Sequence, residues 1–391
     1  MPIPRRRASR RARAALALAA ALLAAACTSG TEQVAGSQPS STASAGASLA
    51  GVCPATVVVQ SNWWPQAEDG AIFSLLGGEL TVDRKRKRVS GQLVSRGVDT
   101  GVRLEFRSGG PANSFIPAVS AMFTDSSITL ATADTDQIAQ VAARQRVKAV
   151  FGQLDRSPVV LMFDPAKHPD FKTIRDIGRA GTRVVYFQGA TYMDYLVGSG
   201  QLRQSQVDAG YTGTPDRWVA SRGEIVQQGF LTNEPYAYEK ELPAWNRKVG
   251  WLLVADSGYP VYPETLTVRA DREAELAPCL RRLVPMIQRA MVDYVTNPAA
   301  TNALIVRLAA DFDAYEYSPA RAAYAVSTMK ANKIVGNGSN GTIGDFDPAR
   351  VTELLDIVRP IFAKSRQPLP AGLDADDVAT NAYVEPSLGL S

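Results

Sequence analysis

Short β-branched and apolar runs alternate with segments of helical spacing between residues 56 and 255, and this alternation limits the possible fold more than any other feature. Strands that alternate with helices predict an α/β fold with mostly parallel sheets. Beyond residue 273 the spacing is mainly helical. The predicted strands are 56–59, 102–106, 127–131, 158–163, 183–187, 224–231 and 249–255, and the predicted helices are 115–123, 138–145, 174–178, 192–197, 276–295, 298–311, 318–333 and 348–364.

Two apolar runs, near 158–163 and 250–256, bracket a middle segment that has its own strands and helices. This arrangement predicts two α/β lobes. Lobe one would be assembled from 55–158 and 256–391, and lobe two from 159–255. The chain would cross between the lobes twice, which predicts a hinge and a cleft that holds a ligand.

The N-terminal segment has the order of an export signal. Six arginines lie between Arg5 and Arg13, and Ala14–Ala26 is an apolar run that ends at Cys27. This run is too short to cross a bilayer as a helix, which needs about 20 residues. Small residues directly before Cys27 resemble a bacterial lipobox, so we expect residues 1–26 to be a signal peptide and Cys27 to be lipidated. The alternative is a non-lipidated signal with an incidental cysteine, and export by the general or the twin-arginine route stays open.

Residues 28–50 are almost all Ser, Thr, Gly, Ala, Gln and Pro, with no aromatic residue. Such a composition cannot bury enough surface to fold, so we expect a flexible tether over residues 27–54. A lipid anchor followed by a tether predicts a bacterial protein held at the outer face of the cytoplasmic membrane. We expect it to be a monomer.

Charge and cysteine content exclude several classes of function. Without the six N-terminal arginines, 36 of the 42 basic residues remain against 38 acidic ones, which argues against nucleic-acid binding. One histidine, His168, and three cysteines make a metal centre or a histidine-based hydrolase unlikely. If Cys27 is acylated, Cys53 and Cys279 remain as a pair in an oxidising compartment, and we expect a disulfide between them. Two separate buried thiols are the alternative.

The segment Asn62–Gly70 directly follows the first predicted strand, where open α/β sheets bind ligands. Trp63 and Trp64 offer flat faces for stacking a ring or a cation, and Glu68 offers an acceptor. Because neighbouring side chains diverge, we expect one of the two tryptophans on the ligand and the other in the core.

Two further loops follow predicted strands in the same way. Thr232–Tyr236 carries the hydrogen-bonding side chains Asn233, Glu234 and Tyr236. Gln188–Tyr192 lies between a strand and a helix, so its amides, with Thr191 and Tyr192, are candidates for holding a polar or anionic group. The alternative for Thr191 is an ordinary helix N-cap.

The run Arg84–Arg88 is strongly basic. It has two interpretations, a contact with anionic lipid or a partner protein, or a solvated loop tip or strand edge. The second interpretation is the simpler one.

Several segments together resemble the solute-binding proteins of ABC transporters, in the branch that binds thiamine precursors, nitrate, sulfonates and taurine. They are the lipobox, the Trp-Trp-Pro-Gln-Ala-Glu-Asp-Gly-Ala segment from Trp63, the Thr-Asn-Glu-Pro-Tyr segment from Thr232, and the segments 170–178 and 380–388. The resemblance implies a type II periplasmic-binding-protein fold with two lobes. It also implies Trp64, Glu68, Asn233, Glu234 and Tyr236 as ligand contacts. Asp69-Gly70 departs from the His-Ala or His-Gly of thiamine-precursor relatives.

From this resemblance we expect a binding protein, with no catalytic residues and no cofactor, that delivers a small molecule to an ABC permease and its ATPase subunit. The tryptophan pair and the Asn-Glu-Pro-Tyr segment favour a planar nitrogen heterocycle, resembling a thiamine pyrimidine precursor or a flavin. The alternative ligand is a sulfonate- or nitrate-type anion. An enzyme related to pyrimidine-precursor synthases and a structural surface lipoprotein are the other classes considered.

Overall fold

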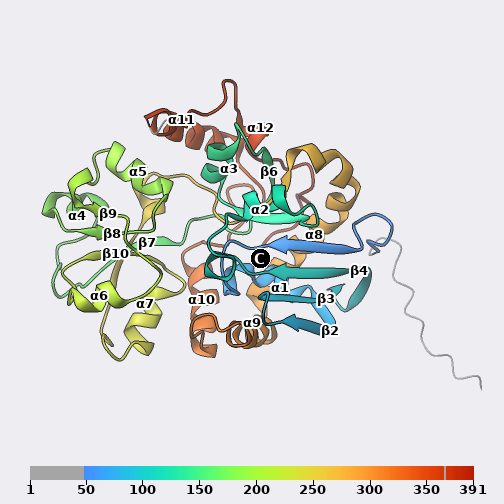
Figure 1. Cartoon of the computed structure of the whole chain (residues 1–391), viewed down its shortest axis with the longest axis horizontal. Helices are drawn as coiled ribbons and strands as arrows, with labels where there is room; N and C mark the ends of the chain where they lie inside the picture. The colour runs from blue at the N-terminus through green and yellow to red at the C-terminus, as the bar shows by residue number, and fades with distance from the viewer. Residues whose placement is uncertain (1–47, 365–366) are drawn as a thin grey trace, which may run out of the picture. The chain divides into compact units, whose positions relative to one another are not determined.

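The computed structural model describes residues 48–364 and 367–391, which belong to one compact unit. Its strands form two separate sheets, each covered by helices (Figure 1). The chain therefore has the two α/β lobes that the sequence predicts. The predictions for the signal peptide, for Cys27 and for the tether up to residue 47 lie outside the described residues.

The first sheet forms the centre of lobe one and has seven strands in the order β2-β3-β4-β1-β5-β12-β6. The central strand β1 pairs in parallel with β4 and β5. Val57, Val58 and Val59 are all buried, because both faces of this strand are covered. The strands are β1 (Thr56–Gln60), β2 (Leu76–Asp83), β3 (Arg88–Ser95), β4 (Val98–Arg107), β5 (Leu130–Ala133), β6 (Val147–Phe151) and β12 (Thr265–Arg269).

The second sheet forms the centre of lobe two and has five strands in the order β11-β7-β10-β8-β9. The chain enters it between β6 and β7 and leaves it between β11 and β12. These two connections are the only crossings between the sheets in residues 48–364. The strands are β7 (Val159–Phe163), β8 (Val184–Val185), β9 (Val207–Asp208), β10 (Val226–Phe230) and β11 (Gly250–Leu253).

The prediction of mostly parallel sheets is wrong, because both sheets are mixed. In lobe one, β2, β3 and β4 form an antiparallel meander, and β12 runs antiparallel to β5 and β6. In lobe two, β7 runs antiparallel to β10 and β11. Strands joined by short turns must run antiparallel, and the sequence analysis missed β2 and β3 because glycines and exposed polar residues obscure their alternation.

The helices cover the sheets, and the longest one, α8, buries an apolar stripe against lobe one. Gly70 starts α1 under this helix, where a Cβ atom would come within 2.0 Å of the Tyr294 ring, so the close approach of α1 and α8 requires glycine. The helices are α1 (Gly70–Ser74), α2 (Ala118–Thr124), α3 (Thr135–Val141), α4 (Ile174–Ala180), α5 (Thr191–Gly198), α6 (Asp216–Ala220), α7 (Glu234–Tyr236), α8 (Glu273–Thr296), α9 (Ala299–Asp311), α10 (Pro319–Ala331), α11 (Pro348–Lys364) and α12 (Ala375–Val378).

Cys53 and Cys279 form a disulfide, as the sequence predicts, with their Cα atoms 4.7 Å apart. The bond joins the segment before β1 to α8 within lobe one. Cys279 is fully buried. The two parts of the chain that build lobe one, separated by the whole of lobe two, are thus joined covalently.

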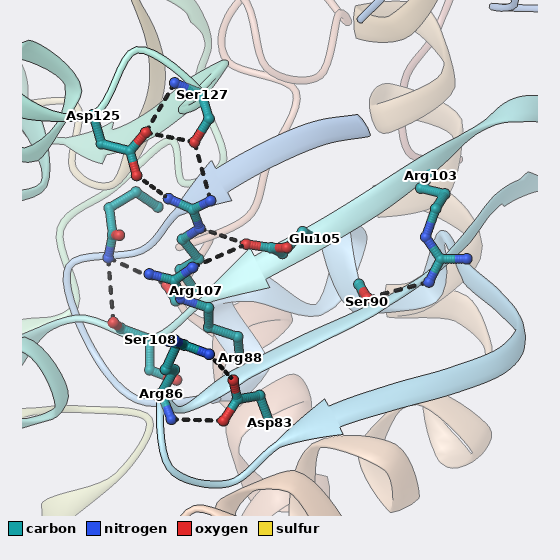
Figure 2. Close-up of polar contacts among 11 residues, drawn as sticks. Asp83, Arg86, Arg88, Ser90, Arg103, Glu105, Arg107, Ser108, Asp125 and Ser127 are labelled. Carbon is teal, nitrogen blue, oxygen red and sulfur yellow. Dashed lines mark hydrogen bonds and ion pairs between the residues drawn. The ribbon is translucent and has the colours of Figure 1, made fainter. Parts of the chain in front are cut away.

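The basic run Arg84–Arg88 forms the turn between β2 and β3, and most of its cations pair with acids of lobe one. Arg84 pairs with Asp311 at the end of α9, and Lys87 pairs with Asp313. Figure 2 shows that Arg86 pairs with Asp83 and that Arg88 pairs with Glu105. Nearby, at the end of β4, the buried Arg107 donates hydrogen bonds to Glu105, Asp125 and Ser127. The run is therefore a strand-edge turn with internal partners, which favours the simpler of its two interpretations.

No helix within residues 48–364 and 367–391 combines the length and the apolar character that a membrane span requires.

Candidate functional site

A cavity of about 290 Å³ lies at the ends of strands from both sheets. Its lining comes from the segments that follow β1, β5, β8 and β10 and from the residue before β12. A surface hollow of about 690 Å³ beside β2 and α9 is larger, but a few residues of lobe one alone line it. The lining residues of the cavity are Asn62, Trp63, Gln66, Asp134, Asp136, Gln137, Val159, Phe187, Gln188, Gly189, Ala190, Thr191, Tyr192, Gln228, Phe230, Asn233, Glu234 and Glu264.

The fold places these segments together because β1, β4 and β5 run in parallel, as do β8, β9 and β10. The carboxyl ends of parallel strands meet at one edge of a sheet, and this edge is where open α/β sheets bind ligands. Here one such edge from each lobe contributes to the same cavity. The two halves of the lining are therefore far apart in sequence.

Trp63 forms an aromatic wall of the cavity. Its ring lies 5.8 Å from that of Phe187, edge to face, and 6.3 Å from that of Phe115. Gly110 supports it from behind, in a left-handed conformation with φ +57°, where a Cβ atom would come within 2.5 Å of the indole. Trp63 belongs to lobe one and Phe187 to lobe two, so this ring contact joins the lobes across the cavity.

Trp64 points elsewhere. It is half-buried and packs against a large hydrophobic cluster that includes core residues of both lobes, and the cavity lining drawn from the described residues does not include it. The divergence expected for adjacent side chains thus separates the two tryptophans.

Asn233 and Glu234 line the cavity at the start of α7. Glu234 accepts hydrogen bonds from the Phe230 amide at 2.7 Å and from the Tyr211 hydroxyl at 3.3 Å. Burial raises the pKa of Glu234 despite these bonds. Tyr236 is not part of the described lining, and its ring lies 4.9 Å from that of Tyr324 on α10.

Gln228 orders the loop between β8 and α5. Its Oε1 atom accepts hydrogen bonds from the Tyr192 hydroxyl at 2.7 Å and from the Phe187 amide at 2.9 Å. Thr191 and Tyr192 both line the cavity and are almost fully buried. The N-cap of α5 is Ala190, whose side chain cannot cap, so Thr191 is not the N-cap that the alternative interpretation required.

Glu68 and Asp69 lie outside the lining that the described residues form, in the turn before α1. Glu68 is 3% exposed and accepts a hydrogen bond from the Thr232 hydroxyl of lobe two. Burial raises the pKa of Asp69 to about 8, and the neighbouring Glu68 carboxylate adds to the rise. Burial also raises the pKa of Glu68.

Among the lining residues that the sequence did not indicate are three acids and a buried glutamine: Asp134, Asp136, Glu264 and Gln228. The first two could have been found, because they follow the predicted strand 127–131 just as Trp63 follows the first strand. Glu264 has no comparable signal, since β12 was not recognised. Burial raises the pKa of Asp134 to about 7, and the nearby Asp136 adds to the rise.

The two lobes touch beside the cavity through α10. Arg321 on α10 pairs with Glu241 and donates to the Asn233 Oδ1 atom at 3.3 Å. The Tyr324 hydroxyl donates to the Leu231 carbonyl at 3.1 Å. Together with the bond from Thr232 to Glu68, these contacts hold the two sides of the cavity together.

Comparisons with known proteins identify the fold. No family model and no curated protein matches the sequence. Several solved structures match the fold at low identity. The alkanesulfonate-binding protein of Xanthomonas axonopodis pv. citri is 12% identical, with a TM-score of 0.53, and the match covers 84% of this chain and 99% of that one.

Two other solved structures match similarly. The aliphatic sulphonate-binding protein of Escherichia coli is 15% identical, with a TM-score of 0.51, and the match covers 86% of this chain and 94% of that one. A ligand-binding component of an ABC-type import system from Staphylococcus aureus is 12% identical, with a TM-score of 0.52 and coverages of 85% and 99%. The chain therefore has the periplasmic-binding-protein fold that the sequence predicts.

Proposed function

We propose that this protein is an extracytoplasmic solute-binding protein of an ABC importer, which captures a small molecule between its two lobes and delivers it to the permease. The observation that carries the proposal is the cavity itself, because strand ends of both sheets build it and both lobes contribute aromatic and polar side chains. Such clefts between lobes are common ligand sites. The solved structures of similar fold include binding components of import systems, which supports the same conclusion.

The comparisons support the anionic alternative better than the heterocycle. The descriptions of the similar proteins name alkanesulfonate and sulphonate, and a nitrate-binding protein of Synechocystis PCC 6803 also matches, at 11% identity with a TM-score of 0.50 and coverages of 84% and 86%. No comparison supports a planar heterocycle.

We propose Trp63, Thr191, Tyr192, Asn233 and Glu234 as the ligand contacts, because they line the cavity. The other three candidates would act as supports. Trp64 packs in the core, Glu68 bonds to Thr232 across the lobes, and Tyr236 stacks on α10.

The lobes would close by bending at the two connections, from Phe151 to Val159 and from Leu253 to Thr265. Opening would separate Trp63 from Phe187, whose rings lie 5.8 Å apart here. A ligand that contacts both lobes therefore binds the closed state more tightly and drives closure. The proposed lobe boundaries, at residues 158–159 and 255–256, lie in these connections.

The tryptophan pair allows a matched test of the site. Trp63→Ala is expected to weaken ligand binding about tenfold or more, because the ligand loses a stacking face and buried apolar area. Trp64→Ala is expected to leave affinity nearly unchanged while lowering stability, since it removes a core contact. Calorimetry with a ligand found by thermal-shift screening of sulfonates, nitrate, pyrimidines and flavins would measure the affinities. X-ray scattering would follow closure.

Three results would contradict parts of this proposal. Unchanged affinity in Trp63→Ala would show that the site is not the Trp63 cavity. Absence of any ligand-dependent thermal shift would favour a structural surface lipoprotein. Turnover of a bound pyrimidine would favour the enzyme class.

We further propose that the mature chain begins at a lipidated Cys27, which holds it at the outer face of the cytoplasmic membrane. The charged, apolar and small-residue segments before Cys27 support this proposal. Mass spectrometry of the native N-terminus is expected to find diacylglycerol on Cys27, and Cys27→Ala is expected to release the protein from membranes. A mature N-terminus at another residue would contradict it.

A further inference from the structure

All four charged side chains in the described lining of the cavity are acidic. Asp134 and Asp136 come from the start of α3, Glu234 from α7, and Glu264 from the segment before β12. Among the lining residues that the structure describes there is no lysine or arginine. We infer that this cavity binds a small organic cation, a molecule whose protonated or quaternary nitrogen lies against these carboxylates. The inference rests on the proposed function and gives its ligand a chemical class.

Glu264 is the residue that points most directly to a missing positive charge. It is 3% exposed, and its Oε2 atom has no hydrogen-bond partner within the described part of the chain. Its Oε1 atom receives a long hydrogen bond, 3.4 Å, from Gln66, and the Asn62 side chain also interacts with the carboxyl group. A buried carboxylate needs partners, so this side chain is poised for a donor that arrives with the ligand.

The backbone holds Glu264 firmly in this position. Its φ angle is +50°, in the left-handed region that non-glycine residues rarely occupy. The Glu264 amide donates to Asp134 Oδ1 at 2.8 Å, and its carbonyl accepts from the Gln153 side chain at 2.9 Å. Unusual backbone conformations persist where the surroundings fix them, and they cluster at ligand sites.

The surroundings add negative charge. Glu68 and Asp69 lie close to Glu264, and both act with burial to raise its pKa. The nearby cation Arg321 is already paired with Glu241. The titratable and charged groups around the cavity include Glu68 and Asp69 before α1, Asp134 and Asp136 at α3, Tyr192 on α5, Glu234 and Tyr211 in lobe two, Tyr259 and Glu264 before β12, and Arg321 on α10.

These buried carboxyl groups can avoid an uncompensated negative charge in two ways. Without a ligand they retain protons, as the raised pKa values of Asp69 and Asp134, about 8 and about 7, indicate. With a cation they can ionise, because its charge replaces that of the protons. Binding of a cation therefore releases protons, and its affinity rises with pH. An anion would be repelled by ionised carboxylates and would bind only while these groups are protonated, so its affinity would fall as the pH rises.

The lining favours an organic cation over a metal ion. The described residues contain no group of three or more His, Cys, Asp or Glu side chains that could hold a metal. Trp63, Phe187, Tyr192 and Phe230 instead surround the carboxylates with aromatic surface. Aromatic faces attract alkylammonium and similar cations, and they bury the apolar part of such a ligand. A volume of about 290 Å³ suits a small molecule of this kind.

Matched probes that differ in charge test the inference on the mature protein. Benzylamine and benzyltrimethylammonium serve as cations, benzyl alcohol as their neutral counterpart, and benzenesulfonate and nitrate as anions, within a wider thermal-shift screen of amines, alcohols and sulfonates. We expect stabilisation by cations only. Calorimetry of the best cation between pH 6 and pH 8 is expected to show affinity rising by up to about tenfold per pH unit for each proton released.

Glu264→Gln keeps the shape of the side chain and removes its charge. We expect it to weaken binding of the best cation about tenfold or more and to flatten the pH dependence, with little effect on a neutral probe. Glu275→Gln removes a carboxylate that is 67% exposed at the start of α8 and is expected to change affinity less than about twofold. The pH profile of the unaltered protein tests the inference independently of whether the variant folds.

Each outcome has one meaning. Stabilisation by cations, with affinity that rises with pH and depends on Glu264, supports the inference. Stabilisation by sulfonates or nitrate alone, or affinity that falls with pH, overturns it and leaves the proposed binding function intact. Stabilisation by no compound of any class in the screen overturns the proposed function as well.

Discussion

Replacement of both Cys53 and Cys279 by alanine is expected to lower the free energy of unfolding by about 3–5 kcal/mol. The disulfide closes a loop between positions 226 residues apart, so its loss frees a large part of the unfolded chain. It also removes the covalent link between the segment before β1 and α8, which belong to the two separate parts of the chain that form lobe one. Urea denaturation followed by circular dichroism would measure the change.

The third cysteine supplies the control for this experiment. Cys27→Ala lies outside the described residues and leaves the pair intact, so it is expected to keep the unfolding midpoint of the parent protein. Reduction of the parent protein should reproduce the effect of the double replacement. A loss below about 1 kcal/mol in the double variant would contradict the expectation that the disulfide stabilises lobe one.

The ligand-free protein is expected to lose stability as the pH rises from about 5 to about 8.5. The pKa of Asp134 is raised to about 7 and that of Asp69 to about 8, while both would titrate near 3.9 in the unfolded chain. The folded state therefore binds more protons than the unfolded state over this range, and stability falls as the pH passes through the folded pKa values. Each pH unit over which one of these groups keeps its proton only in the folded state lowers stability by about 1.4 kcal/mol, so the expected loss is several kcal/mol, shared between the coupled groups.

Asp69→Asn isolates the largest part of this effect. Asp69 is 1% exposed and one of its oxygens has no hydrogen-bond partner within the described residues, so the amide removes a charge that the site does not compensate. We expect this variant to be more stable than the parent at pH 8.5 and to show a flatter pH profile. Asp170→Asn, on an exposed loop, is the control and should retain the parent profile. Constant or rising stability of the parent between pH 5 and pH 8.5 would contradict the expectation.

Much of the fold could be predicted because its strands are buried on both faces. Continuous apolar runs such as Thr56–Val59 and Pro158–Phe163 mark strands covered by helices, and they correspond to β1 and β7. Long helices with an apolar stripe, such as α8 and α11, were found with bounds close to those observed. The hairpin of β2 and β3 was missed because glycines and exposed polar residues obscure the apolar alternation of its strands.

The candidate site was predictable only in part. The rule that ligands lie at strand ends selected three loops, and each of them contributes to the cavity. It could not separate Trp63 from Trp64, because which of two adjacent side chains turns inward depends on the neighbours each one meets. Trp63 contacts Gly110 and Phe187, whereas Trp64 packs against a hydrophobic cluster drawn from both lobes.

The sequence by itself determined the α/β class, the division into two lobes, the Cys53–Cys279 pair and the loops that follow the strands, because these depend on periodicity, composition and spacing along the chain. Only the tertiary structure decided the charge of the cavity. The lining acids Asp134, Glu234 and Glu264, and Asp69 near Glu264, are scattered over nearly 200 positions and are unremarkable where they stand in the sequence. The fold brings them to the same few strand ends and removes them from water, and mutual repulsion with burial then turns ordinary acids into groups that require either protons or a cation.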